Sequence, residues 1–132
     1  MSNRQYQQFS WSNVTMPVTV YAQVTFGASG APTLNKGSQD ISSITRNSAG
    51  DYTIVFRQTF KQLLGISAVF NSGASLPAAP IMRIKDNSIA TAASKSLEIV
   101  FQNDANAPAA TDPANGEIVF ISFVFNNSSL SN

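Results

Sequence analysis

The sequence predicts an all-β fold, an antiparallel β-sandwich or jelly-roll-like domain of about seven strands with an extended N-terminal arm. Three observations support this prediction. Short segments rich in Val, Ile, Phe and Thr alternate apolar and polar residues with a period of two. Turn-forming residues separate these segments at short intervals, and no segment has the pattern of a long helix. No short internal repeat indicates a parallel β-helix.

Length and composition predict one domain. A chain of 132 residues has room for a single core, so we assign residues 1–13 to the arm and residues 14–132 to the β-sandwich. Charged residues make up only 11% of the chain, against about 25% in typical globular proteins. Ser, Asn, Thr and Gln must therefore cover much of the surface. The chain contains no Cys, so no disulfide stabilises the fold.

The charge pattern argues against several classes of function. The net charge is +1 and the Lys and Arg residues are scattered, so we expect no nucleic-acid binding. No segment has the run of apolar residues needed to span a membrane, and we expect neither a membrane partner nor a signal peptide. His is absent, which removes the commonest general base and the commonest metal ligand.

The first thirteen residues are polar but contain three large aromatic residues, Tyr6, Phe9 and Trp11. Their spacing fits neither a helix nor a strand. We interpret the segment as an extended arm whose aromatic side chains anchor it on a partner, with a frayed terminus as the alternative.

The first half of the domain reads as a strand followed by a hairpin. Residues 18–26 alternate cleanly, and residues 27–40 form a polar loop. Residues 41–46 and 51–57 form two strands joined by a turn, in which Gly50 supplies a positive φ.

The segment Thr59–Gly65 predicts one helical turn, capped by Thr59 and ended by Gly65. Its apolar side chains, Phe60, Leu63 and Leu64, would close one end of the core.

Three further strands are predicted over residues 66–70, 81–85 and 95–102, and in the last of them Val100 points outward. Residues 103–115 form a long loop, which in a compact domain usually serves a function or lies at an interface.

The final strand, residues 116–126, is apolar on both faces. One face carries Val119, Ile121, Phe123 and Phe125, and the other carries Ile118, Phe120 and Val124. Two explanations follow. Either the strand is central and buried on both sides, which we favour, or its second face meets another chain.

The titratable residues offer little chemistry. Glu98 and Glu117 could pair as a glycosidase acid and nucleophile, but we interpret both as exposed, solubilising charges. Asp104 and Asp112 flank the long loop without the alternating oxygen ligands of a calcium site. With no His to activate a nucleophile, we expect no enzymatic activity, no cofactor and no metal.

Several segments resemble a known family. Gly50–Phe56 reads GDYTIVF, Leu63–Gly65 reads LLG, Pro113–Val119 reads PANGEIV, and Asn127–Ser129 follows the final strand. These strand and turn motifs resemble small structural proteins of tailed-bacteriophage virions, among them capsid cement or decoration proteins. The resemblance covers residues 18–129 and leaves out the arm.

The resemblance implies a β-sandwich on the outside of the capsid, where it bridges and stabilises major capsid protein subunits. We also expect the chain to form homo-oligomers. The residues that we expect to bind partners are Tyr6, Phe9, Trp11, Phe120 and Val124.

An alternative is a head-fibre or tail-associated virion module that binds host surface glycan. Such a module needs exposed aromatic side chains in a shallow groove, and Tyr21, Tyr52 and Trp11 are the candidates. For the two tyrosines we favour packing on a sheet surface.

Overall fold

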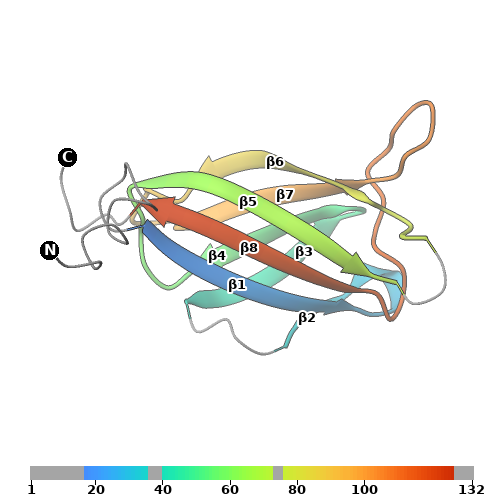
Figure 1. Cartoon of the computed structure of the whole chain (residues 1–132), viewed down its shortest axis with the longest axis horizontal. Coiled ribbons are helices and arrows are strands. Elements are labelled where there is room, and N and C mark those ends of the chain that lie inside the picture. Colours follow the sequence, from blue (N-terminus) through green and yellow to red (C-terminus); the bar gives the residue numbers. More distant parts are fainter. Residues whose placement is uncertain (1–16, 36–39, 73–75, 127–132) are drawn as a thin grey trace, which may run out of the picture.

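The structure, a computed structural model, describes residues 17–35, 40–72 and 76–126, and it confirms the all-β sandwich. Two antiparallel sheets of four strands each face one another (Figure 1). The strands are β1 (Pro17–Phe26), β2 (Pro32–Leu34), β3 (Ile41–Ser48), β4 (Asp51–Phe56), β5 (Gln62–Asn71), β6 (Ile81–Ser88), β7 (Ser96–Gln102) and β8 (Ile118–Asn126). The described ranges contain one 3-10 turn, η1 (Ala28–Gly30), and no helix long and apolar enough to cross a membrane.

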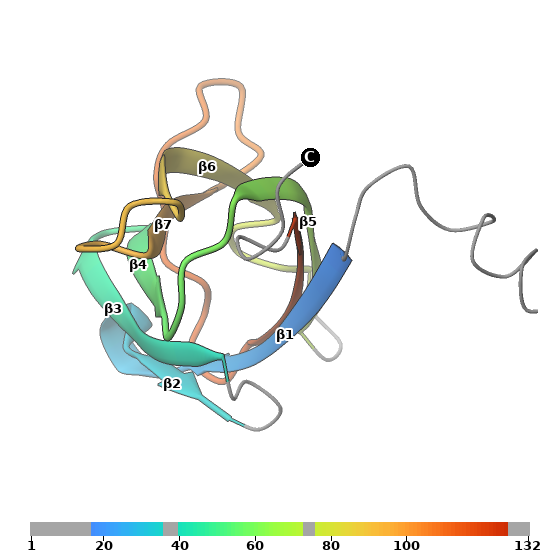
Figure 2. The ribbon, with the colours of Figure 1, turned by 90° about the vertical axis from the view of Figure 1, so that its left-hand side faces the viewer.

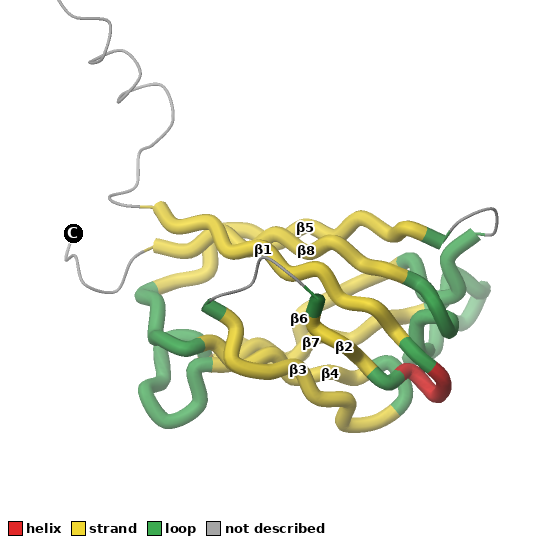
Figure 3. The backbone as a smooth tube through the Cα atoms, turned by 90° about the horizontal axis from the view of Figure 1, so that it is seen from below, coloured by secondary structure: helices red, strands yellow, loops and turns green. Residues whose placement is uncertain are grey.

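The first and last strands pair at the centre of one sheet. This sheet, called the front sheet below, has the order β2-β1-β8-β5, and the back sheet has the order β3-β4-β7-β6. In the side view of Figure 3, β1, β5 and β8 lie above β3, β4, β6 and β7, and β2 comes close to β3. Pro17 lies opposite Asn126 in the β1–β8 register, so both ends of the described sandwich lie at one end. The long loop between β7 and β8 projects from the opposite end (Figure 1).

The core lies between the two sheets, which Figure 2 shows in a view along the strands. Aromatic side chains fill it in two groups. At the loop end, Phe26, Tyr52 and Phe101 contact one another edge to face, with ring centroids 5.2–5.6 Å apart. At the other end, Phe60 stacks on Phe125 at 4.2 Å.

The predicted inward face of the final strand is confirmed. Val119, Ile121, Phe123 and Phe125 are at most 1% exposed, and β8 is paired on both sides by β1 and β5. The favoured explanation of its second face is wrong, because Phe120 is 42% exposed. The hairpin of β3 and β4 is also confirmed, and Gly50 has a φ of 72°.

Two predictions about local structure are wrong. The segment expected to be only a loop contains β2, which pairs with the end of β1 and makes the eighth strand. Residues 62–65 of the expected helical turn instead open β5, because pairing with β8 satisfies their backbone groups. A bulge between Leu63 and Gly65 leaves Leu64 40% exposed, while Phe60 is buried as expected.

Val100 lies outside the core cluster, in line with its predicted outward direction, but its side chain is only 3% exposed. It lies on a central strand, with Asp51 of β4 on one side and Arg83 of β6 on the other. A short apolar side chain between two longer neighbours is covered even on an outer face.

Candidate functional site

The front sheet contains no charged residue in any of its four strands. The charged residues that lie in strands all belong to the back sheet: Arg46, Asp51, Arg83, Lys85, Asp86 and Glu98. The two outer faces of the sandwich therefore differ in chemistry. The face on the front sheet presents only apolar and uncharged polar side chains to its surroundings.

Three large side chains stand out on the outer face of the front sheet. Val69 is 65% exposed, Tyr21 is 60% exposed and Phe120 is 42% exposed. Val69 of β5 lies directly opposite Phe120 of β8, and Tyr21 of β1 lies opposite Ser122, two residues along from Phe120. The patch crosses three strands, and Val124, half-buried, continues it along β8.

Of the five residues predicted to bind a partner, the structure brings Phe120 and Val124 onto this one face. The other three, Tyr6, Phe9 and Trp11, lie outside the described residues. Sequence reasoning missed Val69, although its place opposite Phe120 follows once β5 is paired with β8.

The outer face of the back sheet carries a small ionic network. Lys85 Nζ donates to Asp51 Oδ2 at 2.7 Å and to Glu98 Oε1 at 2.8 Å. Burial opposes ionisation of Asp51, but the hydrogen bonds from Lys85 and Asn47 outweigh it and lower the pKa of that carboxyl. The hydrogen bonds that Lys85 donates to the carboxylates of Asp51 and Glu98 raise the pKa of Lys85. This network joins β4, β6 and β7 on the back sheet.

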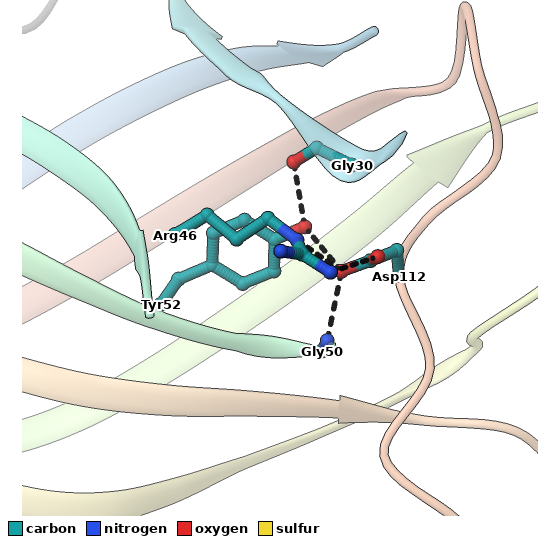
Figure 4. Close-up of polar contacts among 5 residues, drawn as sticks. All are labelled: Gly30, Arg46, Gly50, Tyr52 and Asp112. Atoms are coloured by element: carbon teal, nitrogen blue, oxygen red, sulfur yellow. Dashed lines mark hydrogen bonds and ion pairs between the residues drawn. The ribbon is translucent and has the colours of Figure 1, made fainter. Parts of the chain in front are cut away.

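Asp112 fastens the long loop to the loop end of the sandwich (Figure 4). Arg46 donates to both oxygens of its carboxylate, at 3.0 and 2.8 Å. The amide of Gly50 and the hydroxyl of Tyr52 donate to Oδ1 of the same carboxylate, and the tyrosine hydroxyl also lies 2.8 Å from the carbonyl oxygen of Gly30. The contacts lock four chain segments together.

These contacts shift the pKa values in the cluster. The hydrogen bond from Arg46 is the largest cause that lowers the pKa of Asp112, and the bonds from Gly50 and Tyr52 add to it. Burial, followed by the hydrogen bond to Asp112, raises the pKa of the Tyr52 hydroxyl. Tyr52 is fully buried, so it is not a surface residue and cannot serve the glycan groove that was its predicted alternative role.

A pocket of about 440 Å³ opens at the loop end, between the ends of β5 and β8. The lining consists of Asn71, Ser72, Leu76, Ala114, Asn115, Gly116, Glu117 and Ile118. Glu117 was predicted to be an exposed charge, and that prediction is wrong, because the residue is 4% exposed. The sequence carries no local signal of this burial, because it depends on packing around the PANG turn that precedes Glu117.

The described residues contain no group of three or more His, Cys, Asp or Glu that could hold a metal ion. Comparison with protein-family models, with curated proteins and with solved structures finds no match to this chain. The arrangement of the two outer faces and of the pocket is therefore the main basis for assigning a function.

Proposed function

We propose that this chain is a bacteriophage capsid decoration protein that docks on the viral shell through the outer face of the front sheet. One observation carries the proposal: a sheet with no charged residue exposes Val69, Tyr21 and Phe120 side by side. The cores of protein interfaces are depleted in charged residues and enriched in aromatic ones. The face has this composition, and the back sheet does not.

The proposal commits to one occupant of the face, an uncharged surface of the major capsid protein. Burying a large apolar side chain contributes roughly 1.5–3 kcal/mol, so three such residues supply a modest but useful affinity. A shell repeats the same contact many times, and a chain that bridges neighbouring subunits would gain further from avidity. The resemblance in the hairpin, LLG and PANG segments supports the viral setting. A second copy of the chain is the competing occupant.

The glycan-binding head-fibre or tail-associated module receives less support. Stacking on sugars needs exposed aromatic rings in a groove, and among its candidates Tyr52 is buried and Trp11 lies outside the described residues. Tyr21 stays exposed, but it lies on a sheet face beside Phe120 rather than in the pocket lining.

The test is the copy number of the chain in purified virions of the phage that encodes it, measured by quantitative mass spectrometry. Decoration predicts hundreds of copies, in a fixed ratio to the major capsid protein. The variant Phe120→Ser should fail to bind shells that lack the native protein, whereas Ser43→Ala on the outer face of the back sheet should bind normally. Tens of copies or fewer, or equal binding by Phe120→Ser, would overturn the proposal.

The oligomeric state of the isolated chain shows whether the face binds the major capsid protein or a second copy of the chain. Sedimentation of the isolated chain should show the same mass for the native protein and for Phe120→Ser if the face meets the shell. A dimer or trimer that dissociates in Phe120→Ser would assign the face to a second copy instead.

A further inference from the structure

The pocket at the loop end contains a carboxylate without a partner. Glu117 is 4% exposed, and its Oε1 atom is buried with no hydrogen-bond partner. The hydroxyl oxygen of Ser72, on the opposite strand end, is also buried and unpartnered. Both residues line the same pocket. The pocket is thus lined by residues from two different strand ends, each with a buried oxygen that the described part of the chain does not satisfy.

Buried carboxylates in proteins are almost always paired with a cation or with several donors, because removing the charge from water is costly. The other carboxylates near the loop end follow this rule, since Asp112 has Arg46 and Asp51 has Lys85. Among the described residues, the pocket lining includes no Lys or Arg. The group that would complete the pair must therefore come from outside the lining.

We propose that this pocket is a socket for a cationic side chain, the guanidinium or ammonium group of an Arg or Lys presented by a protein partner. Glu117 supplies the charge, and the side chains of Asn71, Ser72 and Asn115 supply further oxygens. Leu76 and Ile118 give the apolar walls along which the methylene stem of a long cationic side chain packs. A volume of about 440 Å³ holds such a side chain with water to spare.

Two features favour an inserted side chain over a sugar or a metal ion. The lining offers no aromatic ring on which a sugar could stack. It offers only one carboxylate, whereas calcium takes six to eight oxygens and usually several acidic ligands. Gly116 lies in the lining with a φ of 86°, and an added Cβ there would meet no atom within 4 Å.

The socket continues the outer face of the front sheet. Asn71 and Ile118 are register partners at the ends of β5 and β8, and both also line the pocket. In this respect the inference rests on the proposed function: the partner would cover the uncharged face and insert one cation at its end. A desolvated charge pair of this kind fixes the register of a contact that apolar residues alone leave free to slide.

The experiment is an NMR titration of the full ¹⁵N-labelled chain with three small compounds. N-acetyl-arginine amide and N-acetyl-lysine amide carry the two cationic groups. N-acetyl-citrulline amide has nearly the shape of the first but no charge. The amides of Asn71, Gly116 and Glu117 are the reporters, because all three residues line the pocket. We expect saturable shifts of these amides with at least one cationic compound and none with the citrulline compound. The tighter-binding cationic compound indicates whether the pocket prefers the guanidinium group of Arg or the ammonium group of Lys.

Two variants locate the charge. Glu117→Gln keeps the shape of the side chain and should weaken binding at least about tenfold, as expected for loss of a hydrogen bond to a charged group. Glu98→Gln, which removes a carboxylate of the back sheet, should leave binding unchanged. Because Glu117 has no partner in the fold, Glu117→Gln should not lower the melting temperature.

Equal shifts with citrulline amide, shifts with calcium or a methyl glycoside but not with the cations, or no shifts at all would each overturn the socket. So would a Glu117→Gln variant that unfolds, because it would show that the carboxylate supports the fold. These results are independent of virion copy number. A chain absent from virions could still bind arginine amide, and a chain abundant in virions could fail to bind it.

Discussion

Arg46 and Asp112 lie 66 residues apart in the sequence and form a two-pronged ion pair, with nitrogen–oxygen distances of 3.0 and 2.8 Å. Arg46 lies on an edge strand of the back sheet and Asp112 lies in the long loop before β8. Asp112 also accepts hydrogen bonds from Gly50 and Tyr52. The loop is thereby fixed beside the turn of the β3–β4 hairpin.

Asp112→Ala should lower the free energy of unfolding by about 1–3 kcal/mol, because it leaves several donors without their acceptor. The midpoint of urea denaturation measures the change. Asp104→Ala is the matched control, since Asp104 is exposed in the same loop. A midpoint for Asp112→Ala equal to that of the control would show that the cluster adds nothing to stability.

The carboxylate of Asp112 should also make the stability of the fold depend on pH in the acidic range. The pKa of Asp112 lies below its ordinary value of 3.8 in the folded state, so the unfolded chain binds this proton more readily. The stability it contributes is complete above that ordinary value and is lost as the pH falls through the lowered pKa. Melting curves of the native chain and of Asp112→Asn should therefore converge in acid. Curves that stay parallel down to the lowest pH would contradict this assignment.

The two faces of β8 should respond differently to substitution. Phe123 is fully buried, so Phe123→Ala should cost about 3–5 kcal/mol through lost burial and the cavity left behind. Phe120 is 42% exposed, so Phe120→Ser should change stability little while it abolishes shell binding. Denaturation midpoints compare the two variants, and equal losses would mean that the outer face is part of the core.

Alanine variants of Gly50 and Gly116, two glycines with positive φ, should distinguish the effect of steric crowding from that of backbone strain. A Cβ on Gly50 would lie 2.5 Å from the Thr111 nitrogen and 2.6 Å from the Phe101 oxygen, both backbone atoms. A Cβ on Gly116 would meet nothing within 4 Å. Both alanine variants carry the left-handed penalty of about 1–2 kcal/mol, and Gly50→Ala carries a clash in addition. Gly50→Ala should therefore have the lower melting temperature, and the opposite order would refute the packing at the hairpin turn.

Deletion of residues 2–12 tests the predicted arm. The buried core runs from Val20 to Phe125, so we expect the truncated chain to keep its melting temperature. If Tyr6, Phe9 and Trp11 anchor the chain on a neighbour, the truncated chain should occupy fewer sites on shells. Full occupancy would remove the aromatic residues from the interface, and an unfolded product would make the arm part of the domain.

The sandwich could be predicted because alternating apolar and polar residues indicate a strand, whose side chains point to opposite faces in turn. The inward set on β8 and the β3–β4 hairpin followed from period-two patterns and from a glycine in a turn. Leu64 was misassigned because its outward direction depends on a bulge, which exists only when β5 pairs with β8. The strand β2 was missed because three residues that include a proline carry almost no periodic signal.

The site was harder to predict than the fold. Phe120 and Val124 could be predicted to bind a partner because they are apolar and lie on the second face of the final strand, opposite the face that packs in the core. Val69 joins them only through strand order, which the sequence does not encode locally. Glu117 resembles a surface charge in the sequence, and its burial depends on packing around a turn that brings distant strand ends together.

Pro17 and Asn126 are register partners at one end of the antiparallel β1–β8 ladder, and this arrangement determines how the fold would bear mechanical load. A pull applied through both of these ends would peel β1 from β8 one residue pair at a time, as a zipper opens. A pull between this end and the opposite, loop-bearing end would instead act along the strands and shear nine pairs together. The sandwich should therefore resist a pull along its strands better than a pull applied through Pro17 and Asn126.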